Sequence, residues 1–253
     1  MMQRIVFASD LDNTLLFSRK YAIETDICVE HLEGRPQGYL TQDAPWYLER
    51  IMQRGLFIPV TSRSMEQYRR IQFPDRCRPQ YAVTTNGAVL LINGEMDRQW
   101  YQESLKAVSP WKGALEKALQ ALSGQPQARR CRMVDEMFVF AACDTAQDAL
   151  AVQKAMYDIT PLNIEVTGRK IYFFPPQINK GAVIPKLRSR FQADCVICAG
   201  DSSMDIPMLE QADIAIVPDQ SLMKSVSCGK KVVCTSSQRF YEFVLREAAA
   251  YMS

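Results

Sequence analysis

Short apolar runs alternate with amphipathic segments over the first third of the chain. Three of the runs predict strands, at residues 4–9, 56–62 and 80–87. Two segments between them place apolar residues at helical spacing, at 44–54 and 64–71. Two apolar patches that flank a Gly-Arg-Pro-Gln-Gly turn predict a hairpin at about 27–41. This order of strands and helices predicts a parallel sheet with helices packed on it.

The pattern changes after residue 87. An Asn-Gly pair between apolar runs predicts a further hairpin, because this pair suits the tight turn that joins two strands. Mixed elements are then predicted: a helix at 110–122, a strand at 130–142, a helix at 145–158, and strands at 162–167 and 170–174. These residues predict an inserted α+β domain over 88–174.

Strands and helices alternate again after residue 179, up to a last helix from about residue 237. The predicted fold is therefore of the α/β class. Residues 1–87 and 175–253 are expected to form a Rossmann-like, doubly wound parallel sheet core, into which the α+β domain is inserted.

Composition and charge narrow the possible functions of the 253-residue chain. Its net charge is +2, from 30 basic and 28 acidic residues, which gives no reason to expect nucleic acid or an anionic membrane as a partner. No stretch approaches the ~20 apolar residues of a membrane span, and the first residues lack the layout of a signal peptide. Eight scattered cysteines predict reduced thiols in a cytoplasmic protein. Because His31 is the single histidine of the sequence, catalysis by a Ser-His or Cys-His pair is not expected.

Four clusters of polar residues lie where predicted strands end or helices begin. They are Asp10 and Asp12 in SDLDNTL, the TSRS segment at 61–64, Lys180 in INKG, and Asp201 and Asp205 in GDSSMDIPML. Ligands of open α/β sheets bind at the carboxyl ends of strands, where carboxylates suit magnesium and free N–H groups suit phosphate. Each cluster alone is also typical of turns and helix caps, but their order along the chain favours a shared site.

These motifs resemble those of the haloacid dehalogenase (HAD) superfamily of phosphohydrolases. The resemblance rests on a DxDxT motif after the first strand, Thr and Ser after the second, a later Lys, and GDxxxD. It covers the whole chain, and the insertion resembles the large α+β cap of the Cof-type and sucrose-phosphate-phosphatase-like branch. Met204 departs from the family, whose members often carry Asn directly before the last Asp. That difference bears on substrate binding more than on catalysis.

The resemblance implies a role for each motif. Asp10 would be the nucleophile that forms an aspartyl-phosphate, and Asp12 would be the general acid and then the general base. The implied Mg²⁺ ligands are Asp10, Asp12 through its backbone carbonyl, Asp201 and Asp205. The implied phosphate contacts are Thr61, Ser62 and Lys180. The expected substrate contacts are Arg63, Asn86 and Gly87.

The expected activity is therefore magnesium-dependent hydrolysis of a small phosphate monoester, with a sugar phosphate as the leading substrate class. Neither nucleic acid nor a membrane is an expected partner. One alternative is a phosphosugar mutase or other phosphotransferase of the same fold. Another is a catalytically weak binding or regulatory relative. A signalling receiver module also combines Asp, Thr or Ser, Lys and magnesium, but it lacks the late GDxxxD motif and the insertion.

Overall fold

The computed structural model describes residues 3–234 and 238–252. The chain forms two compact units. The first comprises Met1–Met96 and Lys180–Ser253, and the second comprises Asp97–Asn179. The expected start of the last helix, near residue 237, lies outside the described residues.

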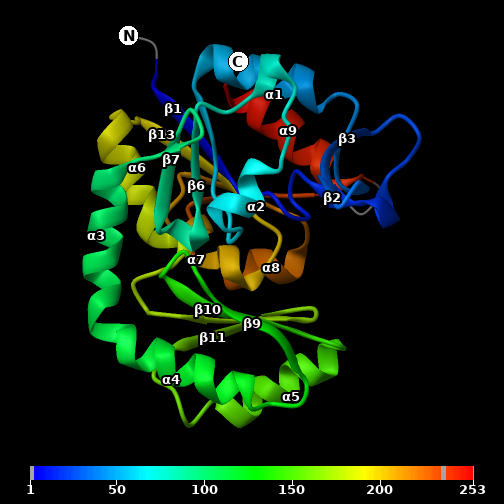
Figure 1. Ribbon diagram of the computed structural model, residues 1–253. Helices are drawn as coiled ribbons and strands as arrows, with labels where there is room; N and C mark the ends of the chain where they lie inside the picture. The colour runs from blue at the N-terminus through cyan, green and yellow to red at the C-terminus, as the bar shows by residue number, and fades with distance from the viewer. Residues whose placement is uncertain (1–2, 235–237, 253) are drawn as a thin grey trace. The chain divides into compact units, whose positions relative to one another are not determined.

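A five-stranded parallel sheet forms the centre of the first unit (Figure 1). Its strands, in spatial order, are β15 (Lys230–Val233), β14 (Ile214–Val217), β13 (Cys195–Ala199), β1 (Ile5–Ser9) and β5 (Leu56–Pro59). All five residues of β1 are buried, as expected for a central strand that is covered on both faces. The chain leaves β1 in one direction to β5 and returns on its other side at β13. The order of the strands therefore reverses between β1 and β13, where a parallel sheet opens a crevice for ligands.

Helices cover both faces of this sheet. Figure 1 shows β1 and β13 between α6 on one side and α1 and α9 on the other. The helices of the first unit are α1 (Ala44–Arg54), α2 (Met65–Arg69), α6 (Val183–Phe191), α7 (Ile206–Leu209), α8 (Gln220–Ser225) and α9 (Phe240–Tyr251). Its 3-10 turns are η1 (Arg19–Tyr21), η2 (Asp75–Cys77), η3 (Thr85–Gly87), η5 (Lys180–Ala182) and η6 (Ser203–Asp205). The predicted α/β fold with a doubly wound sheet is confirmed.

The predicted hairpin at 27–41 forms as β3 (Ile27–Leu32) and β4 (Arg35–Leu40), but its turn lies at 33–34 and not over the Gly-Arg-Pro-Gln-Gly segment, most of which belongs to β4. These strands pair antiparallel, and the short β2 (Phe17–Ser18) joins the outer edge of β4. Glu33 and Gly34 turn the chain with positive φ values of 51° and 74°. The hairpin carries Glu30, whose buried side chain is used by the site described below.

The third strand predicted for the parallel sheet takes a different place. β6 (Tyr81–Thr84) pairs antiparallel with β7 (Val89–Ile92), which pairs with β8 (Glu95–Met96). It meets the central sheet at one isolated parallel bridge, between Val60 and Val83. Pro59 at the end of β5 has no N–H to donate on that side, so the ladder is interrupted there.

The second unit packs helices on an antiparallel sheet. Its strands follow the order β11 (Asn163–Thr167), β12 (Lys170–Phe174), β10 (Phe138–Cys143) and β9 (Ala128–Val134). Its helices are α3 (Arg98–Val108), the 3-10 turn η4 (Ser109–Trp111), α4 (Lys112–Ser123) and α5 (Ala146–Met156). The buried aromatic rings Phe138, Tyr172 and Phe174 pack against one another in its core.

Two sequence predictions for this unit were wrong. The helix α3 was missed, because residues after the Asn-Gly hairpin read as a strand; Asp97 begins the helix by accepting a hydrogen bond from the Trp100 N–H at 3.0 Å. The single strand predicted at 130–142 is a hairpin. Asp135 and Glu136 both take positive φ, 44° and 63°, and reverse the chain between β9 and β10. Two consecutive left-handed residues of this kind form a tight hairpin turn.

The division between the units lies at 96/97 and 179/180, whereas the sequence places the edges of the insertion at 88 and 174. That the insertion acts as a cap stays a prediction. Among the residues the structure describes, no helix combines the length and the apolar character needed to span a bilayer.

Candidate active site

The candidate site lies at the carboxyl ends of β1 and β13, where the strand order reverses. Asp10 follows β1 directly, and Gly200 and Asp201 follow β13. The N–H of Asp10 donates to the Ala199 carbonyl at 2.9 Å, so the ladder between the two strands continues into the site. The sheet therefore fixes the positions of Asp10 and Asp201 through their backbones.

Lys180 joins Asp10 to Asp205. Its Nζ lies 2.5 Å from Asp10 Oδ1 and 2.6 Å from Asp205 Oδ1. All three side chains are buried, with exposed fractions of 3%, 7% and 0%. Burial acts to lower the pKa of Lys180, but the two carboxylates outweigh it and raise the pKa. Lys180 is therefore a fixed cation beside the candidate nucleophile.

Asp205 also organises the loop that follows β13. Its Oδ2 accepts from the N–H groups of Asp201 and Ser202, both at 3.0 Å, and from the Ser202 hydroxyl at 2.9 Å. Gly200 leaves room for this carboxylate, since a Cβ there would lie 2.3 Å from Asp205 Cβ. Both oxygens of Asp205 thus have protein partners. We expect Asp205 to position Asp201 and Lys180 more than to supply a metal oxygen.

Thr14 is a site residue to which the sequence analysis gave no role. Its Oγ1 lies 3.3 Å from both Asp10 Oδ2 and Asp201 Oδ1, and its side chain is buried. A hydroxyl carries one hydrogen, so Thr14 donates to one of these carboxylates at a time. Thr14 is the Thr of the DxDxT motif, and this position in the sequence could have indicated that it belongs to the site.

The acidic groups of the site fit a divalent cation. One carboxylate oxygen each from Asp10, Asp201 and Asp205 lies within 4.8 Å of the others. Burial and neighbouring carboxylates raise the pKa of Asp10 well above its ordinary value, although Lys180 acts to lower it. Burial first, and Asp205 second, raise the pKa of Asp201 to about 7. The positive charge of Lys180 does not offset the effect of burial and of neighbouring carboxylates on these two pKa values. Hard oxygen ligands of this kind suit Mg²⁺.

Asp12 lies beside this cluster and is held by Arg63. The guanidinium donates from Nε to Asp12 Oδ2 at 2.9 Å and from Nη2 to Oδ1 at 2.8 Å. Nη1 of Arg63 contacts Glu30 Oε2 of the β3–β4 hairpin, also at 2.9 Å. Burial acts to lower the pKa of Arg63, but Asp12 and Glu30 raise it above its ordinary value. The structure thus pairs Arg63, which the sequence offers as a substrate contact, with two carboxylates of the protein.

The loops after β5 and β6 bring the remaining candidates together. Thr61 is fully buried, and its Oγ1 accepts from the Arg63 N–H at 3.2 Å. The Asn86 N–H donates to the Thr61 carbonyl at 3.0 Å. Thr85, Asn86 and Gly87 all have positive φ, of 57°, 56° and 107°, which is unusual for three successive residues. Ser62 is partly exposed between Thr61 and Arg63.

Comparison with known structures shows the same fold. Sucrose-phosphatase from Synechocystis sp. PCC6803, solved with sucrose and phosphate, is 15% identical, with a TM-score of 0.64 over 100% of this chain and 98% of that one. A phosphatase of the haloalkanoate (HAD) enzyme superfamily from Bacteroides thetaiotaomicron is 14% identical, with a TM-score of 0.60 over 98% and 96%. The trehalose-6-phosphate phosphatase C-terminal domain of C. albicans is 11% identical, with a TM-score of 0.59 over 99% and 92%.

At these low identities, the three comparisons show that the fold is shared. A search with protein-family models found no match to the sequence. A search of curated proteins found no match either. The chain therefore has the fold of HAD phosphatases, as the sequence motifs predicted, at low sequence identity.

The raised pKa of Asp201 predicts a stability gain for Asp201→Asn without metal. An acid with a raised folded-state pKa binds its proton more tightly in the folded protein, so stability falls as the pH rises from about 4 towards 7. Because one pKa unit corresponds to about 1.4 kcal/mol, we expect Asp201→Asn to raise the free energy of unfolding at pH 8 by at least ~1 kcal/mol. The gain should vanish near pH 4.

Urea unfolding in EDTA at the two pH values measures this difference. Asp75→Asn is the matched control, because that side chain is 95% exposed and pairs only with Arg78 among the described contacts. Added Mg²⁺ should stabilise the wild type more than Asp201→Asn. A variant less stable than the wild type at pH 8 in EDTA would contradict the prediction.

Proposed function

We propose that the chain is a magnesium-dependent phosphomonoesterase that acts through an aspartyl-phosphate on Asp10. One observation carries the proposal: Asp10 lies at the switch point of the sheet, bound to the buried cation of Lys180 and next to carboxylates that suit Mg²⁺. The phosphatases that share this fold support it, since their names state this class of activity.

In the first half-reaction, an oxygen of Asp10 attacks phosphorus and the bond from phosphorus to the ester oxygen breaks. Lys180 holds Asp10 and, with Thr61 and the Ser62 N–H, would bind the phosphoryl oxygens. Asp12 would give its proton to the departing alcohol oxygen. Mg²⁺, held by Asp10, the Asp12 carbonyl and Asp201, would offset negative charge between the nucleophile and the phosphate.

In the second half-reaction, Asp12 takes a proton from water, and the water oxygen attacks phosphorus. The bond to Asp10 breaks, and phosphate leaves with the carboxylate restored. Arg63 suits the base step, in which Asp12 begins as a carboxylate. Its two hydrogen bonds hold the Asp12 carboxylate in one orientation, and Glu30 fixes the guanidinium from the other side.

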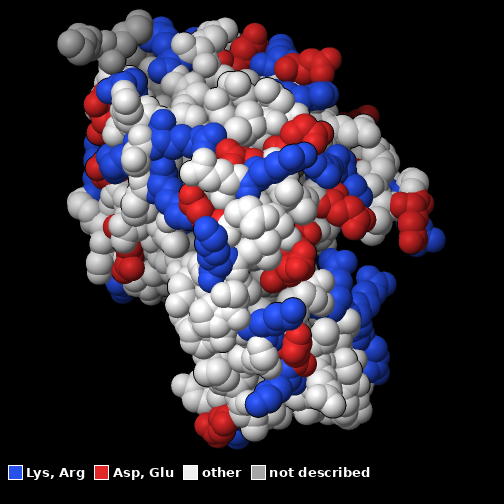
Figure 2. Space-filling model, turned by 60° about the vertical axis from the view of Figure 1, so that its left-hand side comes forward, with Lys and Arg blue, Asp and Glu red and all other residues white. Residues whose placement is uncertain are grey.

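We propose a sugar phosphate as the substrate class, in line with the substrates named for the sucrose-phosphate and trehalose-phosphate phosphatases. The second unit would be the cap, and Asn86 and Gly87 would contact the substrate. The cysteines, all eight of them free, support a cytoplasmic location. Acidic and basic side chains are interspersed on the face in Figure 2, which fits a small ester as partner.

Asp10→Asn should abolish hydrolysis of p-nitrophenyl phosphate, because an amide cannot serve as the nucleophile. We expect loss of at least 10³-fold in kcat, with the circular dichroism spectrum unchanged. Asp144→Asn, on an exposed residue of the second unit, is the control and should keep full activity. EDTA should stop turnover of the wild type, and Mg²⁺ should restore it. Full activity of Asp10→Asn would rule out the proposed nucleophile.

Arg63→Lys should weaken general acid catalysis selectively. A lysine cannot make the two-point contact with Asp12, so protonation of a poor leaving group should suffer most. In single turnovers with excess enzyme, we expect the rate for an alkyl phosphate to fall about tenfold more than that for p-nitrophenyl phosphate, whose leaving group needs no proton. Arg70→Lys is the matched control, because Arg70 contacts Glu30 but makes no described contact with Asp12. Equal losses on both esters would contradict the role assigned to Arg63.

A further inference from the structure

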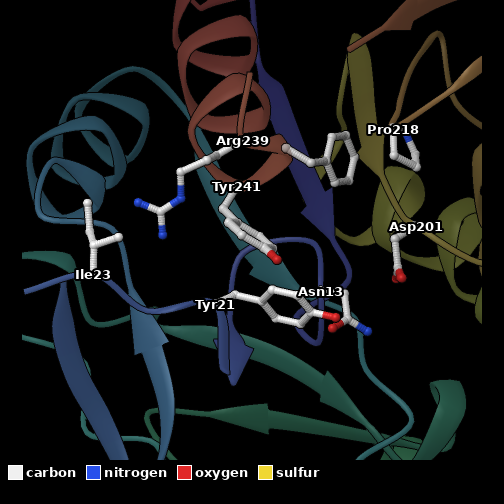
Figure 3. Close-up of a pocket in the computed structure, with 8 residues that line it drawn as sticks. Asn13, Tyr21, Ile23, Asp201, Pro218, Arg239 and Tyr241 are labelled. Atoms are coloured by element: carbon white, nitrogen blue, oxygen red, sulfur yellow. The ribbon is translucent and has the colours of Figure 1, made fainter. Parts of the chain in front are cut away.

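A pocket of about 460 Å³ adjoins the Asp10 site within the first unit. Asn13 and Asp201 form the wall next to the site, and the rings of Tyr21, Phe240 and Tyr241 line much of the remainder (Figure 3). Thr14 Oγ1 lies 3.3 Å from both Asp10 Oδ2 and Asp201 Oδ1. The Thr14 hydroxyl therefore links Asp201, which lines the pocket, to Asp10, the candidate nucleophile. The proposed chemistry uses neither tyrosine.

One ring of the pocket, that of Tyr241, packs on a buried aromatic side chain. Tyr241, near the start of α9, stacks on Phe17, with ring centroids 4.3 Å apart and an angle of 26° between the rings. Phe17 is buried, with 2% of its surface exposed. Tyr21 comes from the segment just after β2 and is half exposed at 51%. A ligand that enters the pocket would therefore meet one rigid ring and one accessible ring.

A partly buried ion pair supports one side of the pocket, which Arg239 lines. Arg239 donates to both oxygens of Asp26, at 3.2 and 2.8 Å, and the Asp26 side chain is only 1% exposed. Asp26 also accepts from the Ile23 N–H at 2.8 Å. This clamp ties the start of α9 to the segment that carries Tyr21, although 213 positions separate Arg239 from Asp26. The two aromatic walls are thus held together before any ligand binds.

The charges of the lining select against an anionic ligand group. Arg239, the one cation that lines the pocket among the described residues, is already paired with Asp26 and with Glu242 at 3.2 Å. Asp201, which would hold Mg²⁺ in the proposed mechanism, lies on the opposite side and offers no cation of its own. The remaining polar groups are the Tyr21 and Tyr241 hydroxyls and the Asn13 amide, which point towards the same end in Figure 3, while Ile23 lies at the other. Such a lining matches an uncharged ring with apolar faces and polar edges.

We propose that this pocket binds the uncharged, hydroxylated ring of a sugar phosphate while the phosphate lies at Asp10. The inference rests on the proposed phosphatase function and adds where the organic part of the substrate binds. The ring faces pack on Tyr241 and Tyr21, and the ring hydroxyls bond to the tyrosine hydroxyls and Asn13. Esters with a second anionic group should bind less well, because Arg239, the one cation that lines the pocket among the described residues, is already paired.

Steady-state kinetics with three kinds of phosphorylated substrate test the proposal. They are neutral-ring sugar monophosphates, 3-phosphoglycerate with its extra carboxylate, and the acyl phosphate acetyl phosphate, which has no ring. The variants are Tyr21→Ala and Tyr241→Leu, the second of which keeps apolar bulk against Phe17. Tyr157→Ala is the control, because Tyr157 is 72% exposed and belongs to the second unit. Melting temperatures confirm that each variant is folded.

We expect the wild type to prefer the best sugar phosphate over 3-phosphoglycerate. Each pocket variant should lower kcat/KM for that sugar phosphate about tenfold more than for acetyl phosphate, mainly through KM. Tyr157→Ala should match the wild type on every ester. Equal losses on sugar phosphate and acetyl phosphate, or none on either, would overturn the proposal.

A tyrosine-dependent preference for adenosine monophosphate over all sugar phosphates would also overturn it, because the ring would then be a flat base. These outcomes differ from failure of the phosphatase function itself. In that case the wild type would hydrolyse none of these substrates, acetyl phosphate and p-nitrophenyl phosphate included.

Discussion

The site depends on one buried cation and the carboxylates that surround it. A lysine ammonium that is almost fully buried is costly unless it is paired, and Lys180 is paired twice, with Asp10 and with Asp205. These contacts join the end of β1, the start of η5 and the loop after β13, which are distant in sequence. Tight packing supports the arrangement, since a Cβ at Gly181 would lie 2.4 Å from the Pro207 carbonyl oxygen. Removal of Lys180 would take this counter-charge from both carboxylates, and removal of either carboxylate would leave Lys180 with one partner in place of two.

The same arrangement concentrates more negative charge than the fold can neutralise. Lys180 forms ion pairs with Asp10 and Asp205, and Arg63 forms ion pairs with Asp12 and Glu30. The pKa of Asp201 is raised to about 7. Groups held at such a cost to stability are typical of functional sites. The site is thus organised in two parts. One part holds the proposed nucleophile, Asp10, and suits a metal, and the other orients Asp12, the proposed acid–base residue, through the β3–β4 hairpin.

Much of this could be predicted from the sequence, for physical reasons. Asp10, Asp12, Thr61, Lys180 and Asp201 follow strands or begin helices whose patterns are clear, so the topology brings them together. The partners of Asp12 could not be predicted, because Glu30 meets Arg63 only through the path of a hairpin. The Asp26–Arg239 pair spans almost the whole chain and leaves no local pattern. Local signals also failed at the β9–β10 turn, where Asp135 and Glu136 adopt left-handed conformations without a glycine.

Pro59 has a consequence for how the first unit is held together. Because the proline has no N–H, the β6–β7–β8 sheet is attached to the central sheet by the single Val60–Val83 bridge and the hydrogen bonds beside it. Side-chain packing carries the rest of the attachment, since Val83, Val89 and Leu90 are fully buried. Thr85, Asn86 and Gly87 lie at the end of β6, so their place beside Thr61 depends on this apolar packing. The backbone ladder of β1 and β13, by contrast, fixes Asp10 and Asp201 directly.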